Sequence, residues 1–556
     1  MNISNKKHIV NLDFLRISFS IVIVFLILLW VYWPGLGVAY DFHDSFYTYM
    51  NEKETCSLHA QWSYFFYIGR PLYALINCFS VSDVINVLQD TVIIRVFSFL
   101  ILVGSTLGIF FLIRYLQYDL ISSIIVAVSL TTLPGMQIFI NMTQASPVLW
   151  SIPFILLAIV CLILWVQCCS LNIDNHKNLL KSMWFLFLIS VFLIISSLIY
   201  QQFSSLFFIF LCLICLSPRY SSFSNRVFFL FLFGVISYGI HGVLYLIVHN
   251  SFILPYALNL MGTTLDQAQG KPFDVVISSD PIGKIEFLFT DLLEKGLRLW
   301  SMSNRHPMIH VTIFLLPLSI LFWSVALVSK AKSTILGISP MQVMGLGVGS
   351  LLVIFLSLIL VNVPNLIAGS SSIAGRHVIA FQGMIIVIIC IGIAQISEIY
   401  FVKKYAGKIL GGVIFSFISV GLIQAKQNFD INMAGLAQKE IAYIRDALAP
   451  RMAELPERIV VIQPHVQSLA LVDGLIDIDD ESGKLTTHYP QDVPWIVLAV
   501  FLDLGGRRDQ FPRVKAFSCC SSMPAFGSGD LVIDMRVFSQ NILNERIGFY
   551  REYKFL

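Results

Sequence analysis

Charged residues are scarce in this sequence of 556 residues: Asp, Glu, Lys and Arg make up 12%, and hydrophobic residues make up 57%. Soluble domains usually carry about 25% charged residues, so this composition, with a mean hydropathy of +0.80, excludes an ordinary soluble protein. The net charge is only +3, and Lys and Arg are dispersed, which argues against a nucleic-acid-binding protein. We therefore interpret the chain as an integral membrane protein.

Ionisable residues are almost absent from the centres of the apolar runs, and His241 is the clearest exception. Pumps and transporters usually carry such residues near the bilayer midplane, and many consist of two repeated halves. The sequence has no evident internal repeat. These absences disfavour a lipid-linked glycan transporter, which is kept as an alternative, and they place any chemistry outside the membrane core.

A small-residue cleavage site is missing after the basic N-terminus, so we interpret the first apolar run as a retained signal anchor. About 20 helical residues cross a hydrocarbon core of about 30 Å, and eleven apolar runs approach that length. They lie at 17–33, 91–113, 119–140, 147–169, 183–200, 203–217, 227–248, 308–328, 342–361, 377–397 and 409–423. The sequence therefore predicts an all-α polytopic membrane protein with about eleven transmembrane helices.

The basic residues between these runs predict the orientation. If the N-terminus is cytoplasmic, every second connection carries Lys or Arg, and the short opposite connections carry none, which is the positive-inside pattern. The residues are Arg114, Lys177, Lys181, Arg219, Arg226, Lys330, Lys332, Lys403, Lys404 and Lys408. Eleven spans then leave residues 34–90, residues 249–307 and the C-terminal tail outside.

The tail differs in composition from the rest of the chain. "NMAGLAQKEIAYIRDALAPRMAEL" has an amphipathic helical pattern, and "RIVVIQP", "WIVLAVFLDL" and "DLVIDMRVF" have the pattern of strands. About 130 residues suffice for a small domain with its own core. We expect residues 1–425 to form the transmembrane module and residues 426–556 to form an external α/β domain.

The cysteines leave disulfide pairing open. Cys56 with Cys78, and Cys519 with Cys520, could pair in an oxidising compartment. Cys212 and Cys215 have CxxC spacing, but their surroundings "FFIFLCLICL" contain no polar group to lower a thiol pKa, so a redox motif is rejected.

Two aspartates, Asp41 and Asp44, follow the first apolar run, with His43 between them. On a helix their carboxylates would share one face and repel each other unless a proton or a cation lies between them. Such a pair suits a general base or a divalent-metal site, so both are candidate catalytic residues and candidate ligands of Mg²⁺ or Mn²⁺. The alternative interpretation is a solvated turn whose acids have no role.

Other polar residues on the predicted outer side could converge on this pair. Arg70 ends the first loop, and Arg376 with His377 begins the tenth run; an arginine at the interface can clamp a phosphate. Contact with lipid headgroups is the alternative for each of them. The candidate substrate-binding residues are His43, Tyr200, Gln201, Arg305 and His306.

Three short motifs carry a family resemblance: "DFHD" at 41–44, "GRPL" at 69–72 and "IYQQFS" at 199–204. With these motifs, and with the multi-span architecture of roughly residues 10–425, the chain resembles the GT-C superfamily of membrane glycosyltransferases. It is most similar to the Gtr-type enzymes that glucosylate bacterial O-antigen. One departure is "NMTQASPVLW" at 141–150, where such enzymes often carry an aromatic-Arg-aromatic-Asp run after the Asn.

The resemblance implies transfer of a sugar, glucose in the Gtr-type enzymes, from a polyprenyl-phosphate carrier to a cell-surface glycan such as O-antigen. It implies lipopolysaccharide modification at the periplasmic face of a bacterial inner membrane, with the lipid-linked donor, the glycan acceptor and membrane lipids as partners. Asp44 or Asp41 would be the base, and Arg376, Arg70 and His377 would bind the donor phosphate. The tail would recognise the acceptor or act as a lid.

Two alternatives remain open. An O-antigen polymerase or ligase would use a diphosphate-linked donor and a late external loop, and "LWSMSNRHPMIH" at 299–310 fits that description. A structural assembly protein would instead use the tail to dock a partner, and it predicts that Asp41 and Asp44 can be changed freely.

Overall fold

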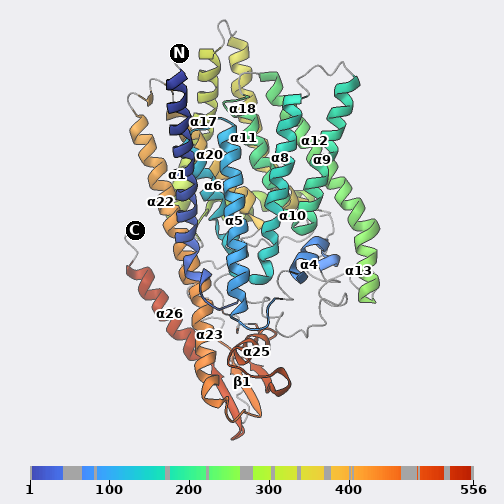
Figure 1. Ribbon diagram of the computed structural model, residues 1–556, viewed down its shortest axis with the longest axis vertical. Coiled ribbons are helices and arrows are strands. Elements are labelled where there is room, and N and C mark those ends of the chain that lie inside the picture. Colours follow the sequence, from blue (N-terminus) through green and yellow to red (C-terminus); the bar gives the residue numbers. More distant parts are fainter. Residues whose placement is uncertain are drawn as a thin grey trace.

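The computed structural model describes most of the chain, and every structural statement below refers to the described residues. These are 3–41, 65–79, 84–168, 176–220, 224–262, 280–301, 307–334, 340–367, 377–397, 399, 402–403, 406–464, 485, 487, 489–518 and 526–552. Within them, eight helices are long and apolar enough to cross a membrane. The protein is a multi-pass helical membrane protein with a small sheet near its C-terminus (Figure 1).

The spanning helices form an elongated bundle (Figure 1). They are α1 (Ile3–Leu36), α5 (Asp90–Tyr115), α8 (Ser151–Cys168), α9 (His176–Ile199), α12 (Ser224–Val248), α17 (Pro307–Thr334), α20 (Ile379–Ser397) and α22 (Gly407–Gln427). The helix α20 is enclosed by its neighbours, because its sequence is apolar on every side. It forms the centre of the bundle.

All eleven predicted runs are helical, but two of them are interrupted and do not form a single helix of spanning length. The run 119–140 is broken at Pro134 into α6 (Leu120–Thr131) and α7 (Pro134–Asn141), which meet at a bend of 57°. A proline inside a helix removes a hydrogen bond and clashes with the preceding turn, which explains the break.

The other interrupted run contains α11 (Leu206–Cys215), which is separated at Ser205 from the single turn of α10 (Gln201–Ser204). The helix α18 (Pro340–Leu360) is continuous over 21 residues. Among the described residues, eight helices, or nine if the bent pair is one span, are long and apolar enough to cross a membrane. The predicted polytopic helical membrane protein is confirmed.

The C-terminal sheet has three parallel strands in the order β2-β1-β3. The strands are β1 (Arg458–Ile462), β2 (Arg513–Phe517) and β3 (Asp530–Asp534), and Val460 pairs with Lys515 on one side and Val532 on the other. The predicted strands in "RIVVIQP" and at the start of "DLVIDMRVF" are confirmed. The helix α26 (Met535–Glu552) follows β3 directly.

The strand predicted in "WIVLAVFLDL" is wrong, because this run forms the helix α25 (Val493–Asp503). A uniformly apolar run has no period that separates a strand from a buried helix, and Pro494 occupies the first turn, where proline favours a helix. The strand β2 was missed because "RVKAF" carries two cations and lies at the sheet edge, where Arg513 and Lys515 are exposed and the other residues are half-buried.

A nearly continuous helical segment joins the bundle to the sheet. The helix α22 passes through the π-helical turns of η8 (Asn428–Ala434) into α23 (Gly435–Leu448), which confirms the predicted helix in the tail. Near the end of α1, the rings of Tyr32 and Phe429 pack edge to face, and Gln438 Nε2 donates to the carbonyl oxygen of Pro34 at 3.2 Å. The predicted domain boundary at residue 425 falls near the end of α22 and stays a prediction.

Candidate functional site

Two motifs separated by 131 positions meet at the end of the bundle away from the start of α1 (Figure 1). Arg70 Nε donates to Gln201 Oε1 at 3.0 Å, and the Arg70 guanidinium lies 4.4 Å from the centre of the Tyr200 ring. Stacking and the hydrogen bond together hold the guanidinium plane in one orientation. The hydrogen bond uses one of its five N–H donors.

The backbone before Arg70 is held by two side chains from other helices. Gln201 Nε2 lies 3.0 Å from the carbonyl oxygen of Ile68 and 2.7 Å from the Tyr245 hydroxyl at the end of α12. The Tyr245 hydroxyl in turn donates to the carbonyl oxygen of Gly69 at 3.0 Å. The position of the guanidinium is therefore fixed from both its side chain and its backbone.

Gly69 is required by this arrangement, and we expect Gly69→Ala to disrupt it. Its φ is +77°, and a Cβ there would stand 2.2 Å from the Tyr245 hydroxyl. The left-handed conformation alone costs an L-residue about 1–2 kcal/mol, and the clash adds to it. The change should lower the thermal stability of the purified protein, measured by tryptophan fluorescence. Gly239→Ala is the matched control, because a Cβ there meets nothing within 4 Å; equal stability of the two variants would contradict the packing.

Asp41 is fully buried and is held by the segment η4 (Thr143–Trp150). The Thr143 hydroxyl donates to Asp41 Oδ2 at 2.6 Å, and the Thr143 backbone N–H donates to Oδ1 at 3.4 Å. Thr143 belongs to "NMTQASPVLW", the segment in which the sequence departs from the Gtr-type pattern. The departing segment therefore supplies a partner for the first carboxylate of the "DFHD" motif.

The residues just before Asp41 are held by Arg95, which lies in the spanning helix α5 and is itself fully buried. Arg95 Nη1 donates to the carbonyl oxygen of Val38 at 2.7 Å, and its guanidinium lies 3.6 Å from the centre of the Tyr40 ring. Burial raises the pKa of Tyr40 to about 12, with Arg95 opposing the rise and Asp41 adding to it. Tyr40 therefore stays neutral at physiological pH.

The same segment η4 also holds the helix that follows Arg70. The Tyr73 hydroxyl donates to the carbonyl oxygen of Gln144, and α4 (Pro71–Asn77) packs against η4. Arg70 is the residue that precedes the first turn of α4. Asp41 and the helix led by Arg70 are therefore fixed to adjacent residues, Thr143 and Gln144, of one segment.

This arrangement predicts the effect of Thr143→Val, which keeps the shape of the side chain but removes the hydroxyl donor to Asp41. Removing the partner of a buried polar group costs about 1–3 kcal/mol, so the variant should unfold at a lower denaturant concentration. Thr312→Val is the matched control, since the Thr312 hydroxyl donates only to the carbonyl of the preceding turn. Indistinguishable unfolding midpoints for the two variants would contradict the role of Thr143.

His377 is held by α19 (Val363–Ile367), a short helix that packs against α10. The turn α10, which contains Gln201, contacts both α19 and α20. Asn365 Nδ2 in α19 donates to the carbonyl oxygen of His377 at 2.9 Å, two residues before α20 begins. The turn α10, which holds Arg70 through Gln201, therefore also packs against α19 and α20.

Five of the ten predicted site residues can be placed. Asp41, Arg70, Tyr200, Gln201 and His377 are described, and the structure brings Arg70, Tyr200 and Gln201 into direct contact. The other five, His43, Asp44, Arg305, His306 and Arg376, lie outside the described residues. Their predicted roles stay predictions, as do those of the five that are placed.

Sequence reasoning did not single out Thr143, Tyr245 or Arg95 as parts of this region. For Arg95 a signal was present, because a charged residue in an apolar helix is costly and usually has a specific partner. For Thr143 and Tyr245 the sequence offers no comparable signal.

Neither a metal-binding cluster nor a reactive thiol is found at the site among the described residues. Among the described residues, no three His, Cys, Asp or Glu side chains gather in a way that could hold a metal ion. Cys78, directly after α4, is disulfide-bonded, and its partner lies outside the described residues, as do Cys56, Cys519 and Cys520. Cys212 and Cys215 are buried free thiols.

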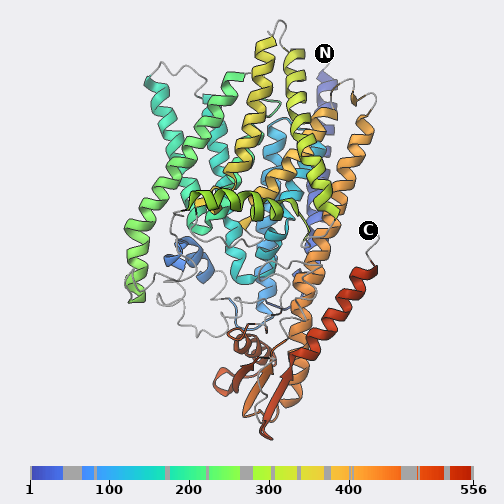
Figure 2. The same cartoon turned by 180° about the vertical axis from the view of Figure 1, so that it is seen from behind.

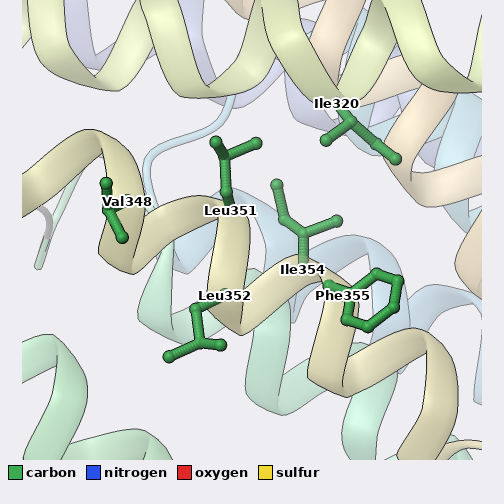
Figure 3. Close-up of a pocket in the computed structure, with 6 residues that line it drawn as sticks. All are labelled: Ile320, Val348, Leu351, Leu352, Ile354 and Phe355. Carbon is green, nitrogen blue, oxygen red and sulfur yellow. The ribbon is translucent and has the colours of Figure 1, made fainter.

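A cavity of about 390 Å³ lies between α17 and α18, away from the polar residues (Figure 3). Six apolar side chains line it: Ile320, Val348, Leu351, Leu352, Ile354 and Phe355. Val348 and Phe355 are also exposed on the outer surface of α18. A lining without a polar side chain suits an alkyl chain of the bilayer and does not suit a sugar or a phosphate.

The sequence matches no family model and no curated protein. The fold is similar to solved structures of an oligosaccharyltransferase from Archaeoglobus fulgidus. For its apo form the TM-score is 0.43 at 12% identity, over 89% of this chain and 65% of that chain. For the complex of this archaeal enzyme, AglB, with an inhibitory peptide and a dolichol-phosphate, the TM-score is 0.40 at 13% identity, over 88% of this chain and 64% of that chain.

A third structure of the archaeal enzyme, in complex with Zn and sulfate, gives a TM-score of 0.39 at 12% identity, over 89% of this chain and 62% of that chain. This chain therefore spans less than two thirds of the structures to which it is similar. The superposition is loose, and it gives no residue of this chain a role.

Proposed function

We propose that this protein is a membrane glycosyltransferase of the GT-C type. It moves a sugar from a polyprenyl-phosphate carrier to a cell-surface glycan such as O-antigen. The proposed sugar is glucose, which the Gtr-type enzymes transfer. The observation that carries the proposal is the contact of Arg70 with Tyr200 and Gln201. The motifs "GRPL" and "IYQQFS" are far apart in the sequence, but the structure brings them together. Tyr200 and Gln201 of the second motif orient the Arg70 guanidinium of the first.

An oriented arginine suits a donor whose leaving group is a phosphate. As the bond between the sugar and the phosphate breaks, negative charge develops on the phosphate oxygens, and donors fixed in advance stabilise it without reorganisation. A planar guanidinium can do so with two parallel N–H groups. Arg70 is the described residue in this role, and Arg376 and His377 are proposed to share it.

The acceptor hydroxyl must lose a proton as it attacks the anomeric carbon, and Asp44 is proposed to accept it. Asp41 is fully buried and hydrogen-bonded by Thr143, so its proposed part is to fix the start of the loop that carries Asp44. His43, Tyr200, Gln201, Arg305 and His306 are proposed to contact the substrates.

A divalent cation, Mg²⁺ or Mn²⁺, is the cofactor that the two aspartates would bind. Asp41 offers one described carboxylate, and both of its oxygens already accept hydrogen bonds from Thr143. A cation there would therefore take its other ligands from Asp44 and further residues outside the described part of the chain. When bound, it would neutralise charge on the leaving phosphate.

The proposed location is a bacterial inner membrane, with the N-terminus in the cytoplasm and the sheet in the periplasm. The positive-inside distribution of Lys and Arg supports this orientation. The disulfide at Cys78 supports it as well, because disulfides persist in oxidising compartments such as the periplasm. A site at this surface lets the prenyl chain stay in the lipid while the sugar meets a water-borne glycan, and the sheet domain is proposed to recognise that glycan.

The test is transfer of radiolabelled glucose from synthetic polyprenyl-phosphate-glucose to lipopolysaccharide in membranes that contain the protein. Membranes from cells without the protein are the control, and a parallel reaction with a chelator tests the metal. Label in lipopolysaccharide only when the protein is present supports the proposal. Equal labelling with and without the protein, over several sugars, would overturn it.

A further inference from the structure

A helical segment lies across the spanning helices on one side of the bundle (Figure 2). It consists of α15 (Pro281–Phe287), η6 (Leu288–Leu292) and α16 (Leu293–Leu297), which follow one another without a break. We call it the crossing helix. Figure 2 shows it as the yellow-green segment that runs across the bundle while its neighbours run along it.

Its contacts place the crossing helix at the level where the spans end. The carbonyl oxygen of Lys295 accepts a hydrogen bond at 3.2 Å from Gln382 in the first turn of α20. Gly296 lies so close to Phe381 that a Cβ would stand 2.3 Å from the ring. The crossing helix therefore lies beside the first turn of α20, a helix long and apolar enough to cross a membrane.

The crossing helix exposes large apolar side chains beside the acidic Glu286, Asp291 and Glu294, while it buries a lysine. Ile282, Ile285 and Phe289 are 78%, 57% and 64% exposed, and their spacing puts them on one face. Lys284, by contrast, is only 6% exposed. A helix on a water-exposed surface would bury the apolar side chains and expose the lysine. This pattern fits a helix that lies in the membrane surface.

The inner side of the crossing helix faces the start of α20. Phe287 and Leu292 form a buried apolar cluster with Val378, the residue after His377. The Lys284 ammonium lies 5.0 Å from the centre of the Phe287 ring, one turn away. The helix therefore places a cation next to the His377 region and apolar side chains on the opposite, outward side.

We propose that the crossing helix is a docking surface for the lipid carrier, with the prenyl chain against Ile282, Ile285 and Phe289 and with the carrier phosphate drawn inward by Lys284. Apolar side chains are exposed on this helix as they are on the spanning helices, and the charge of Lys284, which also interacts with Asp280, is complementary to a phosphate. The inference rests on the proposed function for the identity of the carrier.

The first experiment places the photoreactive residue benzoylphenylalanine at Phe289 of the full-length protein in lipid vesicles that contain radiolabelled polyprenyl phosphate. The same residue at Glu294, which is exposed, lies outside the apolar stripe and pairs with Arg298, is the matched control. We expect a labelled adduct at Phe289 at least several-fold above that at Glu294. Equal labelling at the two positions would overturn the docking surface.

Competition then decides which lipid is bound. Unlabelled polyprenyl phosphate should remove the adduct at Phe289, whereas the same amount of phosphatidylglycerol should leave it. Equal competition by both lipids would overturn the carrier as the occupant. Because this readout needs no catalysis, its failure can be told apart from failure of sugar transfer.

The role of Lys284 is tested in the same assay with Lys284→Gln. The variant should need a several-fold higher concentration of polyprenyl phosphate for half-maximal labelling at Phe289, because the phosphate loses its cationic partner. Lys408→Gln, which removes the same charge at the start of α22, is the control and should behave as the unchanged protein. An unchanged half-maximal concentration for Lys284→Gln would overturn its role, and the unfolding midpoint of the variant checks that it is folded.

Discussion

Sugar transfer by the variant Asp44→Asn is expected to fall by about 10²–10⁴-fold, the usual contribution of a general base. An amide has nearly the same shape as a carboxylate but cannot accept the proton of the acceptor hydroxyl. The loss should appear in kcat, since the donor and acceptor still bind. The measurement is the rate of labelled-glucose transfer in membranes adjusted to equal amounts of protein.

The control for this variant is Asp509→Asn in the sheet domain, where an exposed aspartate pairs only with the nearby Arg507 among the described residues. It should transfer glucose at the normal rate. Normal turnover by Asp44→Asn would refute the assignment of the base, and it would favour the structural assembly protein, for which Asp41 and Asp44 are free to change.

Arg70→Lys is expected to lower transfer by about 10²–10³-fold, the loss measured when one fixed donor to a developing charge is removed. Lysine keeps the positive charge, but it has neither the planar group that stacks on Tyr200 nor the Nε donor that Gln201 accepts. The loss should be larger in kcat than in the KM for the donor, because the charge on the phosphate grows in the transition state.

Arg219→Lys is the matched control for Arg70→Lys. The Arg219 guanidinium also stacks on a tyrosine, 4.0 Å from the centre of the Tyr115 ring, and it donates to the carbonyl oxygen of Tyr115 at 3.1 Å. It lies between α11 and α12, at the other end of the bundle from Arg70. If both variants lose the same activity, the effect comes from the loss of stacking in general, and the proposed role of Arg70 is wrong.

The helices of the bundle could be predicted from the sequence because long apolar runs have few other solutions in a membrane. The sequence did not predict where two of these apolar helices are interrupted. Pro134 bends one predicted span into two helices, and α11 is separated from α10 at Ser205, so both runs have the composition of a span without its length.

In the tail the sequence was less informative, since a small domain buries short apolar runs of either helical or extended backbone. "WIVLAVFLDL" is buried on every side from Ile496 to Phe501 within α25, so its composition shows no alternation and no helical period. The charged edge strand β2 shows the opposite problem, because none of its side chains is fully buried, two are exposed cations and its pairing with β1 is made by the backbone.

For the candidate site, the sequence identified Arg70, Tyr200 and Gln201 separately, and the structure joins them. It could not foresee that Tyr245 and Thr143 complete the arrangement, because a tyrosine and a threonine in apolar helical surroundings are common and have no distinguishing spacing. Their importance arises only from the packing of α12 and η4 against residues far away in the chain.

The central claim is that the phosphate group recognised at this end of the bundle belongs to a monophosphate-linked sugar donor. The most direct measurement gives the purified full-length protein in lipid nanodiscs two labelled donors in parallel, polyprenyl-phosphate-glucose and a polyprenyl-diphosphate-linked glycan, each with an O-antigen acceptor. The account predicts that label moves to the acceptor from the monophosphate donor and that Arg70→Lys removes this transfer. Transfer from the diphosphate donor alone would contradict the account and indicate a polymerase or ligase.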